Sequence, residues 1–102
     1  MITKKELALM KSDAILINTS RGAVIKEEDL INVLKSKSIY GAGLDVFENE
    51  PEINKELVIL DNVVLTPHIG SASIETREEM AIMAAKNVLN VLSGRRPNNK
   101  VY

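Results

Sequence analysis

The residues that could do chemistry in this sequence are one arginine, several carboxylates and the single histidine, and each lies at the end of an apolar run or just beyond one. They are Arg21 after residues 14–18, Asp45, Glu48 and Glu50 at or after the end of residues 39–46, and His68 after residues 63–65. Histidine is the side chain best suited to proton exchange near neutral pH, and a carboxylate beside it can fix its ring. Arginine offers paired donors to a carboxylate and can polarise a nearby carbonyl oxygen. Together these residue types predict the reduction of a 2-oxo acid or the oxidation of a 2-hydroxy acid.

Each of these residues also allows a plainer interpretation when taken alone. A lone histidine flanked by apolar residues is more often structural than catalytic, and Arg21 could pair with a carbonyl at a helix end. A single glutamate among many is by default a solvated surface charge, and Asp45 could shape a turn through its side chain. The prediction of a site therefore depends on whether the fold brings these residues together.

The elements that must position these residues alternate between helix and strand. We expect a short helix capped by Thr3 and Glu6, a strand at 14–18, a helix beginning at 27–29, a strand at 39–46, a loop at 47–61 with a helical turn at 56–60, a strand at 63–65, and a long helix from about 73 to 93 with Ser73 as its N-cap and Gly94 just beyond its end. The first strand is a continuous apolar run, which is typical of a parallel strand buried on both faces.

Glycines mark three places in this pattern where the backbone is under a special constraint. Gly41 and Gly43 lie inside the second strand, where glycine indicates the close approach of another backbone or of a ligand. Gly22 follows the first strand, where we expect a tight turn that needs backbone freedom.

Alternating strands and helices predict the α/β class, with right-handed crossovers, a parallel sheet and flanking helices. In such sheets ligands bind outside the carboxyl ends of the strands. Since Arg21, the carboxylates and His68 all follow strands, we expect them at one edge of the sheet.

Composition limits the partners that this chain can be expected to have. It has 102 residues, a net charge of −1 and 45% hydrophobic residues, so neither nucleic acid nor an anionic membrane is expected as a partner. It contains no cysteine, which excludes disulfides, thiolate catalysis and cysteine-based zinc sites, and no metal site is expected. The apolar runs are too short to span a bilayer and the amino end lacks the pattern of a secretory signal, so we expect a cytoplasmic protein.

Three segments carry a pattern that can be recognised as a whole: residues 16–22 (LINTSRG), 41–51 (GAGLDVFENEP) and 62–71 (NVVLTPHIGS). They closely resemble the signature blocks of the D-isomer-specific 2-hydroxyacid dehydrogenases, a family with D-lactate, formate, glyoxylate/hydroxypyruvate and D-3-phosphoglycerate enzymes. The resemblance continues into the helix from Ser73 and covers nearly the whole chain. It implies that residues 1–102 are the C-terminal half of a Rossmann-type NAD-binding domain, with the last helix leading back towards a substrate domain.

The resemblance implies a role for each matching residue. Arg21 matches the arginine that binds the substrate carboxylate and keto oxygen, His68 matches the catalytic acid and base, and Glu50, rather than Glu48, matches the glutamate paired with that histidine. The cofactor-binding set is expected to be Thr19, Ser20, Arg21, Asp45, His68 and Gly70, and the substrate-binding pair Arg21 and His68. The implied cofactor is NAD, with NADP not excluded, and the implied substrate is a small 2-hydroxy or 2-oxo acid.

Two departures from the family pattern stand out. Lys26 occupies the position of an acidic helix cap, which weakens that cap. No G-x-G-x-x-G turn occurs in these residues, nor an acidic residue placed to bind a ribose, so the phosphate-binding part of the domain is missing from them. We therefore expect the chain alone to be inactive.

A second class of function stays open beside the dehydrogenase: a non-catalytic half-domain that binds a nucleotide or a protein. The combination of Arg21, Glu50 and His68 favours the enzyme, because a binding module has no need of all three. A small parallel sheet also leaves an edge and apolar surface uncovered. We accordingly expect either a homo-oligomer or association with the missing amino-terminal part.

Overall fold

The computed structural model describes residues 1–101, which form two compact units, Met1–Gly70 and the segment from Ser71 onward. The first unit holds helix α1 (Lys4–Leu7), strand β1 (Ile15–Asn18), the 3₁₀ turn η1 (Gly22–Val24), helix α2 (Glu27–Lys35), strand β2 (Gly41–Leu44), helix α3 (Lys55–Val58) and strand β3 (Val63–Leu65). The second unit is built on helix α4 (Ile74–Leu92). The expected order of elements and the α/β class are therefore confirmed.

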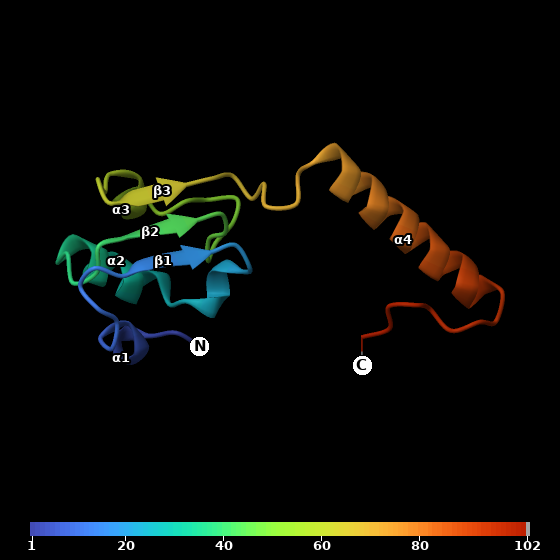
Figure 1. Cartoon of the computed structure of the whole chain (residues 1–102), viewed down its shortest axis with the longest axis horizontal. Helices are drawn as coiled ribbons and strands as arrows, with labels where there is room; N and C mark the ends of the chain where they lie inside the picture. The colour runs from blue at the N-terminus through green and yellow to red at the C-terminus, as the bar shows by residue number, and fades with distance from the viewer. Residues whose placement is uncertain (102) are drawn as a thin grey trace. The chain divides into compact units, whose positions relative to one another are not determined.

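The three strands form one parallel sheet in the order β1-β2-β3, and Figure 1 shows them side by side and pointing the same way. Ile17 lies opposite Gly43, and Gly43 in turn lies opposite Val64. The second strand is shorter than the expected 39–46, because only residues 41–44 pair with β1 and only residues 42–44 pair with β3. The flanking Ile39 and Val46 are nevertheless buried.

The core lies on one face of the sheet, where buried leucines and isoleucines of the helices meet the strands. It consists of Leu16, Ala42 and Leu44 from the sheet, Leu7 from α1, Leu30, Ile31 and Leu34 from α2, Leu57 from α3, and Ile25, Ile39 and Phe47 from the connections. Side chains alternate across a strand, so the other residues of each strand point to the opposite face.

That opposite face corrects the expectation of a strand buried on both sides. Ile15, Ile17 and Val64 are 58%, 66% and 68% exposed, although all three are apolar. The reason is that the helices of residues 1–70 cover only one face of the sheet. The continuous apolar run therefore indicates a face that this unit does not cover by itself.

Local signals in the sequence place the helix ends correctly. Thr3 and Glu6 form the capping box at α1, and Ser73 accepts a hydrogen bond from the amide of Thr76 at the start of α4. Gly94, with φ of 71°, ends α4 as expected. The Arg95 amide donates to the Asn90 carbonyl at 2.8 Å, which completes the reversal of the chain.

Helix α2 is capped from a distance rather than by its own N-cap residue. Lys26 makes no side-chain cap, as expected, but Glu48 accepts a hydrogen bond from the Glu27 amide at 3.2 Å. The Glu27 carboxylate accepts one from the Glu48 amide at 3.2 Å in return. Glu48 thus satisfies a free donor of the helix and joins the loop after β2 to α2.

Close packing against the Phe47 backbone, rather than an unusual backbone conformation, explains why residue 22 after β1 is a glycine. A Cβ at Gly22 would lie 2.0 Å from the carbonyl carbon and oxygen of Phe47, and no left-handed φ occurs there. The expectation of a turn that needs glycine's backbone freedom is therefore wrong at Gly22. In β2, a Cβ at Gly41 would lie 2.6 Å from the Asn62 carbonyl oxygen, as expected of a strand glycine close to another backbone. A Cβ at Gly43 would lie 2.8 Å from the end of the Ile17 side chain and near no backbone atom.

Replacement of Gly22 by alanine should lower the free energy of unfolding of the chain by about 1–3 kcal/mol, because the loops after β1 and β2 must move apart. Gly43→Ala is the matched control, since the exposed Ile17 side chain can rotate away from the new methyl group. Urea unfolding followed by circular dichroism measures both changes. Equal losses in the two variants would contradict this account of Gly22.

Candidate active site

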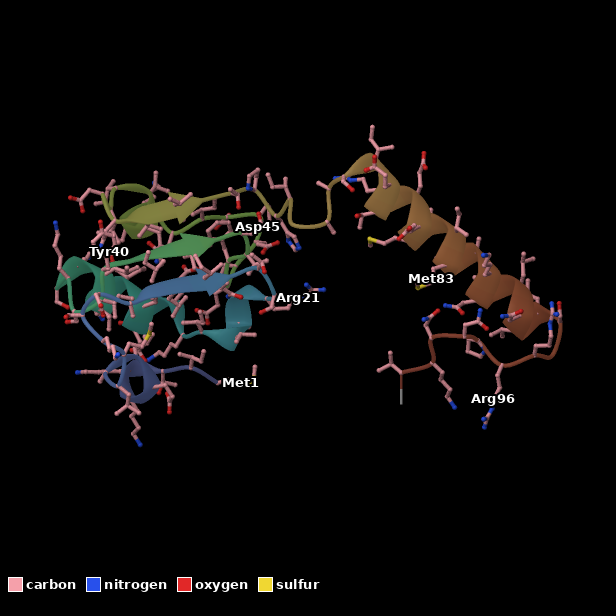
Figure 2. All side chains as sticks on the ribbon, in the orientation of Figure 1. Met1, Arg21, Tyr40, Asp45, Met83 and Arg96 are labelled. Atoms are coloured by element: carbon pink, nitrogen blue, oxygen red, sulfur yellow. The ribbon has the colours of Figure 1, made fainter. Side chains whose placement is uncertain are left out.

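The loops that follow β1, β2 and β3 meet at the carboxyl edge of the sheet and carry the predicted functional residues. Figure 2 shows Arg21 and Asp45 at this edge, at the ends of β1 and β2. His68 comes from the loop after β3, and its ring contacts Glu50 from the loop after β2. The site therefore draws on three separate strand ends.

The loop after β1 is shaped by Asn18, the last residue of that strand. Its side chain is buried, its Oδ1 accepts from the amide and hydroxyl of Ser20 at 3.1 and 2.9 Å, and its Nδ2 donates to the carbonyl of Arg21 at 3.0 Å. The Arg21 guanidinium donates to the Ser20 carbonyl at 2.6 Å and is otherwise exposed. Thr19 and Ser20 lie exposed on the same turn.

Asp45 organises the loop after β3. Its carboxylate, in a residue only 4% exposed, accepts hydrogen bonds from the hydroxyl of Thr66 and from the amides of Ile69 at 2.9 Å and Gly70 at 2.7 Å. The hydrogen bond from Thr66 is the main reason that the pKa of the Asp45 carboxyl lies below its ordinary value, with the Ile69 and Gly70 amides and the charge of His68 acting in the same direction. Asp45 therefore fixes the residues on both sides of His68.

His68 itself adopts an uncommon backbone conformation, with φ of 54°. For a residue other than glycine, such a conformation costs on the order of 1–3 kcal/mol and persists where surrounding contacts impose it. Here those contacts are the bonds from Asp45 to the next two amides, and they set the direction from which the histidine ring leaves the loop.

The ring of His68 is oriented by Glu50. Its Nδ1 lies 2.7 Å from Glu50 Oε2, while Glu50 Oε1 accepts from the Phe47 amide at 2.9 Å. The bond with His68, followed by that from Phe47, lowers the pKa of Glu50, and the charges of His68 and Arg21 lower it further. Because an ionised Glu50 can only accept, Nδ1 carries the proton and Nε2 is the nitrogen left to exchange one.

The three candidate carboxylates bond to different partners and therefore have different structural roles. Glu50 pairs with His68, Asp45 holds the loop around His68, and Glu48 caps α2 away from the pair. The sequence pattern alone did not identify Asn18 and Thr66 as site-forming residues. The available signal was their position at the ends of apolar strands, where Asn18 directly precedes Thr19 and Thr66 lies two residues before His68.

Residues 1–101 contain no group of three histidine, cysteine, aspartate or glutamate side chains placed to hold a metal ion. Within the same residues, no helix combines the length and the apolar character needed to cross a bilayer.

Both site carboxylates should titrate below their ordinary values, which are about 3.9 for aspartate and 4.3 for glutamate. The folded pKa of each is lowered, so each contributes stability that is present above its unfolded pKa and is lost as the pH falls through its folded pKa. Carbon-detected NMR titration of the chain measures both midpoints. Thr66→Val should raise the Asp45 midpoint and leave that of Glu50 in place, because it removes the main cause of the shift at Asp45 alone. An unchanged Asp45 midpoint in this variant would contradict that cause.

The relatives of this chain are dehydrogenases or reductases, and they are much longer than the chain itself. The glyoxylate reductase of Thermococcus litoralis is 59% identical over 101 residues, which are 99% of this chain and 30% of that protein. The chain spans about a third of the length of the relatives and solved structures that it matches.

Two crystal structures have the same fold over almost the whole chain. That of the NADPH-dependent glyoxylate/hydroxypyruvate reductase of Sinorhizobium meliloti, in complex with citrate, matches with a TM-score of 0.91 and 36% identity over 98% of this chain and 32% of that one. That of D-lactate dehydrogenase with NAD⁺ from Lactobacillus jensenii matches with a TM-score of 0.81 and 29% identity over 100% of this chain and 35% of that one.

Residues 1–70 match the family described as D-isomer specific 2-hydroxyacid dehydrogenase, NAD binding domain. The parallel sheet with its flanking helices is the Rossmann-type fold of that domain. The chain belongs to the family of D-isomer specific 2-hydroxyacid dehydrogenases.

Proposed function

We propose that these residues form the catalytic edge of a dehydrogenase that transfers hydride between a nicotinamide dinucleotide and a small D-2-hydroxy acid or its 2-oxo acid. The observation that carries the proposal is the pair of His68 and Glu50, with Nδ1 and Oε2 2.7 Å apart beside the loop of Arg21. A module that only binds a nucleotide has no use for an oriented histidine whose second nitrogen is left to exchange a proton.

His68 is proposed as the acid and base of the reaction. In reduction, the doubly protonated ring gives its Nε2 proton to the oxygen of the 2-oxo group as that oxygen becomes a hydroxyl. In oxidation, the neutral ring takes the hydroxyl proton on Nε2. Glu50 holds the Nδ1 proton in both directions and stabilises the charged ring, while its own ionisation is favoured by its lowered pKa.

Arg21 is proposed to bind the substrate. It lies at the same edge of the sheet as the pair of His68 and Glu50, and its charge is among the causes that lower the pKa of Glu50. A guanidinium there can bind the substrate carboxylate and polarise the adjacent keto oxygen. The citrate in the Sinorhizobium meliloti structure is also a carboxylate compound, and the name of the Thermococcus litoralis relative favours glyoxylate as the first substrate to test.

The residues at this edge fit the nicotinamide end of a dinucleotide. Thr19 and Ser20 lie exposed on the turn after β1, and Gly70 keeps the backbone next to Asp45 clear, since a Cβ there would lie 3.0 Å from the Asp45 carboxylate. The cofactor supplies or accepts the hydride, and we propose that Thr19, Ser20, Arg21, Asp45, His68 and Gly70 border its nicotinamide. NAD and NADP are both compatible with these residues, and the two solved relatives contain or use one of each.

The phosphate-binding turn of such a domain is not among these residues, and the chain covers only 30% of the length of the Thermococcus litoralis relative. We therefore propose that activity needs a further, amino-terminal part that carries this turn. That part would also cover the apolar face formed by Ile15, Ile17 and Val64. We further propose that α4, whose apolar side chains are exposed in this chain, leads towards the substrate domain.

The chain by itself should show no measurable reduction of glyoxylate and only weak binding of NADH. A fusion that places the amino-terminal part of the Thermococcus litoralis relative before residues 1–102 should be active. NADH oxidation at 340 nm and NADH fluorescence compare the two proteins. Turnover by the chain alone would overturn the need for the second part, and a fusion that binds NADH without reducing any 2-oxo acid would overturn the enzymatic proposal.

His68→Gln in the fusion should lower kcat by about two to four orders of magnitude, because the ring that exchanges the proton is lost. The affinity for NADH should stay close to that of the unchanged fusion, since the amide can still bond to Glu50. Stopped-flow kinetics and fluorescence titration measure the two effects separately. A kcat that is retained would remove His68 from the proposed role.

A further inference from the structure

We propose that Asn18 is a positioning residue for Arg21: its buried amide imposes the turn from which the guanidinium reaches the substrate carboxylate. This inference rests on the proposed function, because it assigns Asn18 a role in the binding step given there to Arg21. Asn18 touches no reacting atom and acts through the backbone of the Arg21 loop.

The geometry that carries the proposal is a closed ring of hydrogen bonds. Asn18 is only 6% exposed, and its Oδ1 accepts from the Ser20 amide at 3.1 Å and the Ser20 hydroxyl at 2.9 Å. Its Nδ2 donates to the Arg21 carbonyl at 3.0 Å. One side chain therefore fixes the turn at two successive residues, and the second of them is Arg21.

The backbone of Asn18 ties this turn to the rest of the edge. The Asn18 carbonyl accepts from the Asp45 amide at 3.0 Å, so the start of the Arg21 loop is held against the residue that organises the His68 loop. The Arg21 guanidinium in turn bonds to the Ser20 carbonyl at 2.6 Å, which belongs to the turn that Asn18 shapes. The position of the guanidinium relative to His68 thus depends on this turn.

These hydrogen bonds require an amide side chain at position 18. The Nδ2 of Asn18 donates to the Arg21 carbonyl, and its Oδ1 accepts from the Ser20 amide. In Asn18→Asp the carboxylate would still accept from Ser20, but it would place an oxygen against the Arg21 carbonyl, where two acceptors repel. In Asn18→Ser the hydroxyl can still bond to the Ser20 amide, but it is too short to reach the Arg21 carbonyl. The serine variant adds no charge, so it separates loss of the turn from a direct attraction of Arg21 to a new carboxylate.

The test uses the fusion described above, with Asn18→Asp, Asn18→Ser, Arg21→Gln and the double variants. Both Asn18 variants should raise KM for glyoxylate roughly tenfold to a hundredfold, as expected when a binding group is displaced by about 1 Å. The affinity for NADH should fall by a smaller factor, because Ser20 and Arg21 of the same turn are proposed to border the nicotinamide. In the Arg21→Gln background, each Asn18 variant should raise KM for glyoxylate little further, because the guanidinium that Asn18 positions is already absent. Asn32→Asp makes the same chemical change at an exposed position of α2 and should leave all parameters unchanged.

Three outcomes would overturn the inference. They are a normal KM for glyoxylate in both Asn18 variants, a rise in KM that multiplies fully with that of Arg21→Gln, or a loss of NADH affinity larger than the rise in KM for glyoxylate. Loss of the folded state in both variants, seen by circular dichroism, would also overturn it, because Asn18 would then hold the domain together rather than place Arg21. If Arg21→Gln itself leaves KM unchanged, the proposed function fails instead, which keeps the two failures apart.

Discussion

The buried carboxylate of Asp45 is the constraint on which the rest of the site depends. A charge removed from water must be satisfied by hydrogen bonds or ion pairs. At Asp45 the direct donors all come from the loop after β3: the hydroxyl of Thr66 and the amides of Ile69 and Gly70. The same bonds hold His68 in its left-handed conformation. Ionisation of Asp45 and the placement of His68 therefore stabilise each other.

The second constraint is the contact between the loops after β1 and β2. Gly22 lets the backbone of the first loop pack against the Phe47 carbonyl, and the amide of Phe47 holds Glu50 in place. Glu48, in the same loop, bonds to the start of α2. The Glu50 side chain is thus held by one backbone donor, in a loop that is itself joined to the loop after β1 and to α2. This explains how a pair as exposed as His68 and Glu50, at 46% and 34%, can keep a defined geometry.

The parts of the fold that could be predicted from sequence are those set by neighbouring residues. The capping box of Thr3 and Glu6, the cap at Ser73 and the stop at Gly94 each depend on a few adjacent positions, and all are found where the sequence places them. The shared edge of Arg21, Asp45 and His68 also followed from strand order alone, because parallel strands bring their carboxyl ends together. The choice of Glu50 over Glu48 as the expected partner of His68 came from family resemblance, since spacing alone could not separate them.

What could not be predicted depends on residues that are distant in sequence. The true constraint at Gly22 is Phe47, 25 positions away, and the donors that satisfy Asp45 lie 21 to 25 positions beyond it. The apolar run of β1 led to the expectation of a strand buried on both faces, but Ile15 and Ile17 are exposed because residues 1–70 cover only one face. The sequence pattern shows which faces of a strand are apolar, whereas the burial of each face depends on which other elements pack against it.

The contacts that orient the site residues all come from one of the two compact units of the chain. The hydrogen bonds that orient His68 and Glu50 all lie within residues 1–70. The groups that would hold the phosphates of a dinucleotide are not among these residues. The orientation of the pair of His68 and Glu50 is therefore set by hydrogen bonds within the loops after β2 and β3, and it does not depend on a phosphate-binding turn.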